Sequence, residues 1–169
     1  MLTYQPQNDI YYGIFRFLSI LTRDSSKEYN IDLFKILDFY FLFPNFIPDI
    51  RVTNELLKDK NKFKLYKNAY AIEGNQKQIF HKLNKVQDKI IEILVTKNIL
   101  NITKIKIDII SLNPNTDLPS FLLQQIEAKN HDNYNLLEFL TKLSTLPFYG
   151  EDGLKDRTGL MEYRYDGVN

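Results

Sequence analysis

The segment that most constrains the fold is IDLFKILDFYFL at residues 31–42, which is apolar on almost every side. Its apolar residues recur at helical spacing: Ile31, Phe34, Leu37 and Phe41, with Phe39 and Leu42 widening the stripe. A helix that is apolar all round is a buried one. Since Pro44 has no N–H and restricts the residue before it, the helix should end near Phe43. The sequence therefore predicts a buried central helix that the remaining elements must cover.

One carboxylate, Asp38, lies inside this apolar helix. A buried charge is costly unless it is paired. We interpret Asp38 as half of a buried ion pair, with Arg51 or Arg157 as its partner, in preference to a catalytic role. Asp32 lies six residues away, so the two carboxylates do not share a helix face. Asp38 and Pro44 are thus predicted to be structural residues.

Helical periodicity continues through most of the chain. Further helices are predicted over 9–23 after an N-cap at Asp9, over 76–97, over 119–129 and over 133–146, and a short one begins after Thr53. The short helix offers Leu56 and Leu57 as its apolar pair, and 119–129 offers Leu122, Leu123 and Ile126. Residues 68–75 are predicted to be a loop or a short strand pair.

A β pattern appears only once, where Ile105, Ile107 and Ile109 alternate with charged residues before a turn at Asn113-Pro114. Three helices (10–23, 31–42 and 78–97) followed by a ribbon over 99–112 are typical of a winged helix, although the second and third helices are unusually far apart. We therefore predict a mainly α fold with a small β ribbon (α+β). Its winged-helix-like core with C-terminal helices spans 1–148, and an extended arm spans 149–169.

The residues that usually carry chemistry are scarce. The 169-residue chain has no cysteine, which excludes disulfides, thiolate zinc sites and cysteine nucleophiles. His81 and His131 are isolated, and neither a GxSxG nor a GxxxxGK[ST] motif occurs. We expect no enzyme activity, no metal and no cofactor.

The start of the chain, MLTYQPQNDI, lacks the basic and apolar regions of a signal peptide. The most apolar stretch, FYFLFPNFI, is too short to span a bilayer. We expect a cytoplasmic protein without a membrane partner.

Lysines form three groups that could contact nucleic acid. In KDKNKFKLYK they alternate with Phe63 and Tyr66, a mixture suited to phosphate contact and base stacking. The candidate contacts are Lys60, Lys62 and Lys64 in that segment, Lys82, Lys85 and Lys89 on one helix face, and Lys104 and Lys106 on the ribbon. The alternative is a solvated lysine surface, which a net charge of only +1 favours.

The C-terminal segment has a different composition, with glycines, arginines and tyrosines close together. Arginine forks and tyrosine rings are common in interfaces. The candidate partner-binding residues are Tyr149, Lys155, Arg157, Tyr163, Arg164 and Tyr165, with sharp turns expected at Gly153 and Gly159. An arm strapped across its own core explains the same residues equally well, and both interpretations can hold together.

Two parts of the sequence carry a family resemblance: Leu37-Asp38-Phe39 through Phe43-Pro44, and Gly150 with Asp152 to Lys155 and Arg157 to Tyr165. The chain resembles the middle component of bacterial three-component ABC-ATPase conflict systems, a group that includes Lamassu-like antiphage defence. The resemblance implies a winged-helix-like, non-catalytic adaptor between an SMC-like ABC ATPase and an effector such as a nuclease, with DNA contacted through the complex. A winged-helix DNA-binding regulator is the alternative.

Overall fold

A computed structural model describes residues 5–67, 74–104 and 106–166 of the chain. The helices are α1 (Ile10–Leu21), α2 (Ile31–Leu42), α3 (Asn54–Asn61), α4 (Gln76–Thr96), α5 (Ser120–Asp132), α6 (Tyr134–Leu143) and α7 (Leu154–Thr158), and the strands are β1 (Tyr29–Asn30), β2 (Leu100–Lys104) and β3 (Asp108–Leu112). The fold is mainly helical with one small antiparallel sheet, as the sequence predicts.

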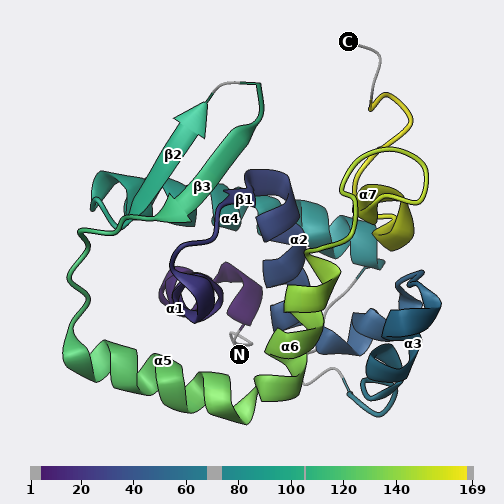
Figure 1. Ribbon diagram of the computed structural model, residues 1–169, viewed down its shortest axis with the longest axis horizontal. Helices are drawn as coiled ribbons and strands as arrows, with labels where there is room; N and C mark the ends of the chain where they lie inside the picture. Colours follow the sequence, from purple (N-terminus) through teal and green to yellow (C-terminus); the bar gives the residue numbers. More distant parts are fainter. Residues whose placement is uncertain (1–4, 68–73, 105, 167–169) are drawn as a thin grey trace.

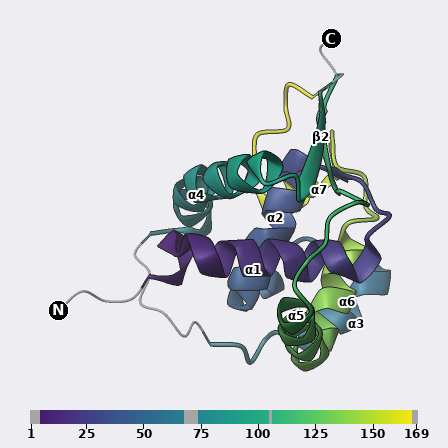
Figure 2. The same cartoon turned by 90° about the vertical axis from the view of Figure 1, so that its left-hand side faces the viewer.

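Helix α2 lies at the centre of the molecule and packs against α1, α4 and α6 (Figures 1 and 2). Every residue from Phe34 to Leu42 is buried. The Asn30 side chain caps the helix by accepting the backbone N–H groups of Asp32 and Leu33 at 2.9 and 3.1 Å. The helix ends at Leu42, directly before Phe43 and Pro44. The predicted buried helix and its end are both confirmed.

The two long neighbours of α2 also begin with side-chain caps. Asp9 accepts the Tyr12 N–H at 3.0 Å at the start of α1. At the start of α4, Asn75 and Gln78 form a reciprocal capping box, in which each side chain accepts the other residue's backbone N–H. Figure 2 shows α1 and α4 running beside each other on one side of α2.

The sheet has the strand order β1-β3-β2, and both pairings are antiparallel. The predicted ribbon over 99–112 is present as the hairpin of β2 and β3, but the alternating isoleucines do not lie within one of its strands. β2 ends at Lys104 and β3 begins at Asp108, so the alternation runs through the turn of a hairpin; Ile105 lies outside the described residues.

The peripheral helices bury fewer residues than their patterns predict. Leu57 in α3 is 44% exposed and Leu123 in α5 is 41% exposed, so neither joins the core as expected. Helix α5 contacts α1 and α6 along the lower edge in Figure 1 and buries only Ile126. A helix that touches the core with one narrow face leaves the rest of its apolar residues in solvent.

The core is a single cluster that reaches from α2 into the C-terminal segment. Leu154 and Leu160 are 0% and 4% exposed and belong to the same cluster as Phe39 and Phe80. Among helices of the described ranges, none is long and apolar enough to cross a membrane. The segment predicted from 68 to 75 as a loop or strand pair falls mostly outside the described residues.

Candidate partner-docking site

A buried polar cluster joins α1, α2 and α4. Arg16 donates from Nε to Asp38 Oδ1 at 2.8 Å and from Nη2 to Oδ2 at 3.1 Å. The Gln87 amide donates to Asp38 Oδ2 at 2.8 Å. All three residues are 0% exposed, so this bidentate pair and its amide hold the three central helices in register.

The partner of Asp38 is therefore not the expected one. The sequence-based expectation was Arg51 or Arg157, whereas the structure places Arg16 against the carboxylate. The pairing depends on how α1 crosses α2, which composition does not reveal. A local signal did exist, because Arg16 is the only charged residue in the apolar run GIFRFLSIL.

Arg51 and Arg157 instead attach the arm, residues 149–166, to the segment before α3. The Arg51 N–H donates to the Arg157 carbonyl at 3.0 Å, and Arg157 Nη1 donates back to the Arg51 carbonyl at 3.2 Å. Arg51 Nη2 also donates to the Asp156 carboxylate at 2.5 Å. Together with the hydrogen bond from the Asp152 N–H, this lowers the pKa of Asp156.

Lys155 closes the arm into a loop. Its ammonium donates to Asp166 Oδ1 at 2.9 Å and lies over the rings of Phe148 and Tyr149. The Gly150 N–H also donates to Asp166, at 3.3 Å. Lys155 and Arg157, predicted to bind a partner, are thus engaged within the chain.

Two glycines of the arm have identifiable roles. A Cβ on Gly153 would lie 2.3 Å from the Tyr149 carbonyl oxygen, so only glycine fits there. Gly159 ends α7 in the left-handed conformation, at φ +65°.

Three of the predicted partner-binding residues of the arm face solvent. Tyr165 is 79% exposed, the Arg164 side chain 74% and Tyr149 43%. The Tyr149 hydroxyl accepts the Asn30 amide at 2.7 Å. Tyr163 is half-buried, and its side-chain hydrogen bond contributes to the lowered pKa of Asp156.

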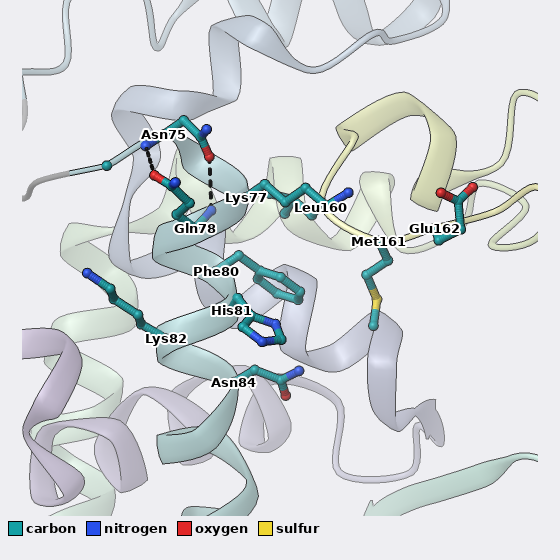
Figure 3. A pocket seen from close by; sticks show the side chains of 11 residues that line it. Asn75, Lys77, Gln78, Phe80, His81, Lys82, Asn84, Leu160, Met161 and Glu162 are labelled. Carbon is teal, nitrogen blue, oxygen red and sulfur yellow. Dashed lines mark hydrogen bonds between the residues drawn. The ribbon is translucent and has the colours of Figure 1, made fainter.

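An open cleft of about 860 Å³ separates the arm from the first half of α4. Figure 3 shows Phe80, His81 and Asn84 of α4 on one side and Met161 opposite them. The complete lining is Gly74, Asn75, Lys77, Gln78, Phe80, His81, Lys82, Asn84, Leu160, Met161 and Glu162. This site was not predicted from the sequence. Its signal was the apolar pair Leu160-Met161 within an otherwise polar tail.

The rim of the cleft is cationic. Its charge comes from Lys77 and Lys82, which are both exposed, and no carboxylate of the described residues lies within ion-pair distance of either lysine. The one acid of the lining, Glu162, accepts the backbone N–H groups of Arg164 and Tyr163 at 3.0 and 3.1 Å, which lowers its pKa. The charge of nearby Lys77 adds to this lowering. Since neither Lys77 nor Lys82 forms an ion pair with a described residue, both ammonium groups remain available to an incoming anion.

Two of the three candidate lysines around α3 make contacts within the chain. Lys60 donates to the Ile50 carbonyl at 3.0 Å and Lys62 to Asp59 at 2.8 Å. Phe63 is 1% exposed and therefore cannot stack on a base. Lys64 is exposed.

The second lysine group follows one exposed face of α4, at Lys82, Lys85 and Lys89. Asp88 reaches away from this group to Lys35, with 2.6 Å between Nζ and Oδ1. Lys104 and Lys106 are exposed at the hairpin tip. Asp88 is thus paired with a buried lysine, whereas Glu92, the next acid along α4, is exposed beside the group.

Metal ligands do not gather in the parts of the chain that the structure describes: there, no group of three or more His, Asp or Glu side chains is placed to hold an ion. His81 lines the cleft and His131 is exposed near the end of α5. The cleft's lining offers apolar contact and positive charge.

Fold and site together describe a small, mainly helical α+β protein with an open cleft between α4 and the C-terminal arm. The chain belongs to the family described as ABC-three component (ABC-3C) system Middle Component 5, whose model matches residues 2–166. A middle component has partners within its ABC-3C system. No curated protein and no solved structure matches the chain at a significant level.

Proposed function

We propose that this chain is a non-catalytic adaptor that links an SMC-like ABC ATPase to a nuclease-like effector in a cytoplasmic, Lamassu-like defence complex directed against phages and plasmids. The observation that carries the proposal is the cleft between α4 and the arm, which is open, partly apolar and cationic at its rim. Membership in a middle-component family supports it, because such a protein has partners within its system.

The way the arm is held also supports an adaptor. Leu154 and Leu160 anchor it in the core, and Arg51 fixes it from outside. One side of the arm therefore packs inward while Met161 and Glu162 border the cleft. A preformed surface binds with little loss of conformational entropy, which suits docking.

The test is co-expression of this chain with the proteins encoded beside it, followed by affinity purification and size-exclusion chromatography. We expect a stable complex that contains both an ATPase and an effector. Because the arm belongs to the core, a chain ending at Tyr149 should misfold rather than selectively lose one partner, so the informative variant is Met161→Asp in the full chain. An intact chain that co-elutes with neither neighbour would contradict the proposal.

A second candidate function, a winged-helix DNA-binding regulator, is favoured by one specific observation. Lys82, Lys85 and Lys89 are all exposed on α4, and the nearby Asp88 is paired with Lys35 rather than with any of them. The order α1-β1-α2-α4-β2-β3 with the sheet β1-β3-β2 is also the connectivity expected of a winged helix with α3 inserted.

Binding of a duplex DNA at several salt concentrations separates the two functions. For a regulator, changing these three lysines to alanine should reduce the slope of log K against log salt by about 0.9 for each phosphate that the protein no longer neutralises. If the isolated chain shows no salt-dependent binding of duplex DNA, the regulator function is excluded and the adaptor function is retained.

A further inference from the structure

The cleft has the length of a short extended peptide. Its lining on α4 runs from Lys77 to Asn84. At a rise of about 1.5 Å per residue this is roughly 10 Å, which about three extended residues would span. An open trough of this length fits a segment of a protein chain better than it fits a compact ligand.

The apolar part of the cleft is suited to one inserted side chain. Phe80 and Leu160 form a fixed surface, since they are 3% and 4% exposed and packed in the core. Met161 is only partly buried, and its flexible thioether can adjust to a side chain of varying shape. Figure 3 shows Met161 on the opposite side of the cleft from Phe80 and His81.

The polar part selects for negative charge. Lys77 and Lys82 offer ammonium groups on the α4 side. On the arm side, the backbone N–H groups of Met161 and Glu162 make no hydrogen bond within the described residues. The two ammonium groups fit carboxylates of a bound segment.

A free phosphate or nucleotide is a poorer occupant. The N-terminus of a helix attracts phosphate when its N–H groups are free. At α4, however, Asn75 Oδ1 already accepts the Gln78 N–H at 3.0 Å, and Gln78 Oε1 accepts the Asn75 N–H at 3.1 Å. The capping box therefore occupies two of the donors that a phosphate would need.

We propose that the cleft between α4 and the arm binds a partner segment that carries one apolar anchor side chain next to Asp or Glu residues. The anchor lies against Phe80, Leu160 and Met161, and the carboxylates meet Lys77 and Lys82. This inference rests on the proposed adaptor function and names the chemistry of the segment that the adaptor recognises.

Site-specific cross-linking tests the inference directly. The photoreactive residue p-benzoylphenylalanine replaces His81 in the complex purified by co-expression, and the cross-linked peptide is sequenced by mass spectrometry. Leu65, which is 90% exposed on another part of the surface, is the matched control position. We expect position 81 to capture a partner peptide with an apolar residue beside Asp or Glu.

Two results would overturn the inference while leaving the adaptor function intact. One is capture of a basic or wholly polar segment at position 81. The other is an intact complex without any cross-link there. Failure to form a complex at all would instead count against the proposed function, so the two failures are distinguishable.

Charge reversal provides a second, quantitative test. Lys77→Glu with Lys82→Glu should weaken partner binding by about tenfold or more, with a smaller effect at high salt, because like charges would then face each other. Lys64→Glu with Lys67→Glu is the control, since both lysines are exposed outside the cleft. Circular dichroism verifies that both variants fold. Equal affinity of the two folded variants would overturn the inference.

Discussion

Two peripheral regions, the arm and α5, differ in a way that secondary structure alone does not suggest. Helix α5 is regular over Ser120–Asp132, yet it buries only Ile126. The arm contains only the short helix α7, yet it buries Leu154 and Leu160 in the core.

Hydrogen bonds to other elements reinforce the difference. In α5, the Asn130 amide reaches the Ser19 carbonyl at 2.9 Å. The arm exchanges several backbone and side-chain bonds with Arg51, and internal bonds through Lys155 close its loop. Attachment to a core thus depends on a few fully buried side chains and on long-range bonds, whereas helix formation is a local property.

Both regions rest on the central helices, so the largest expected effect is at the Arg16–Asp38 pair. Arg16→Ala leaves a buried carboxylate unpaired and should lower the free energy of unfolding by about 3–5 kcal/mol. Chemical denaturation measures the loss, and Arg164→Ala, on an exposed side chain, is the control. If Arg16→Ala costs no more than the control, the pair does not hold α1 against α2.

Truncation of one leucine of the arm tests more directly whether the arm is attached more firmly than α5. Leu154→Ala should lower the free energy of unfolding by about 2–5 kcal/mol, because Leu154 is 0% exposed in the main cluster. Ile126→Ala removes a similar side chain from α5 but should act mainly by local opening, with a smaller global loss.

Hydrogen exchange measured on the wild-type chain supplies an independent readout. The amides of Arg51 and Leu154, which donate to the Arg157 and Pro147 carbonyls, should exchange more slowly than those of α5. Equal protection of the two regions would show that the arm is not attached more firmly than α5.

Gly153→Ala tests the backbone conformation of the arm. The new Cβ would meet the Tyr149 carbonyl oxygen at 2.3 Å, and neighbouring backbone cannot move aside as a side chain can. We expect a loss of about 1–3 kcal/mol in the free energy of unfolding and faster proteolysis within the arm.

The matched control is Gly159→Asn. Asn tolerates the left-handed conformation, and no atom lies within 4 Å of a Cβ at Gly159. Similar losses in the two variants would show that the turn at Gly153 is not sterically closed.

The contrast between these regions also explains what the sequence could predict. The helix at 31–42 followed from local periodicity, and its end followed from Pro44. The attachment of the arm was not predictable in the same way, because Arg51 and Asp156 are separated by 105 positions.

The sequence-based predictions failed where a local apolar pattern was used to infer how elements pack against each other. Leu123 fits an apolar stripe but lies on a helix that touches the core with one narrow face. β1 has two residues, too few to show a period, and it pairs with β3 far along the chain. The cleft was missed for the same reason, since its two sides come from α4 and from Leu160 to Glu162.

The smallest expected effect is a selective loosening of the arm by acid. The pKa of Asp156 is lowered, first by the Asp152 N–H and then by Arg51 and Tyr163. A carboxyl group with a lowered pKa stabilises the folded state above its unfolded value of 3.8, and this contribution is lost as pH falls through the folded pKa. Below about pH 3.8 the arm should therefore loosen before α5 does.

Hydrogen exchange between about pH 5 and pH 2.5, corrected for intrinsic rates, follows this change at the Arg51 and Gly159 amides, with α5 amides as the internal reference. Asp156→Asn should remove most of the pH dependence at those amides, because the asparagine cannot titrate. Glu162→Gln tests whether the second acid of the arm, whose pKa is also lowered, contributes separately. If wild type and Asp156→Asn respond equally to acid, the Asp156 carboxylate does not secure the arm, and its attachment depends on Leu154, Leu160 and the hydrogen bonds between Arg51 and Arg157.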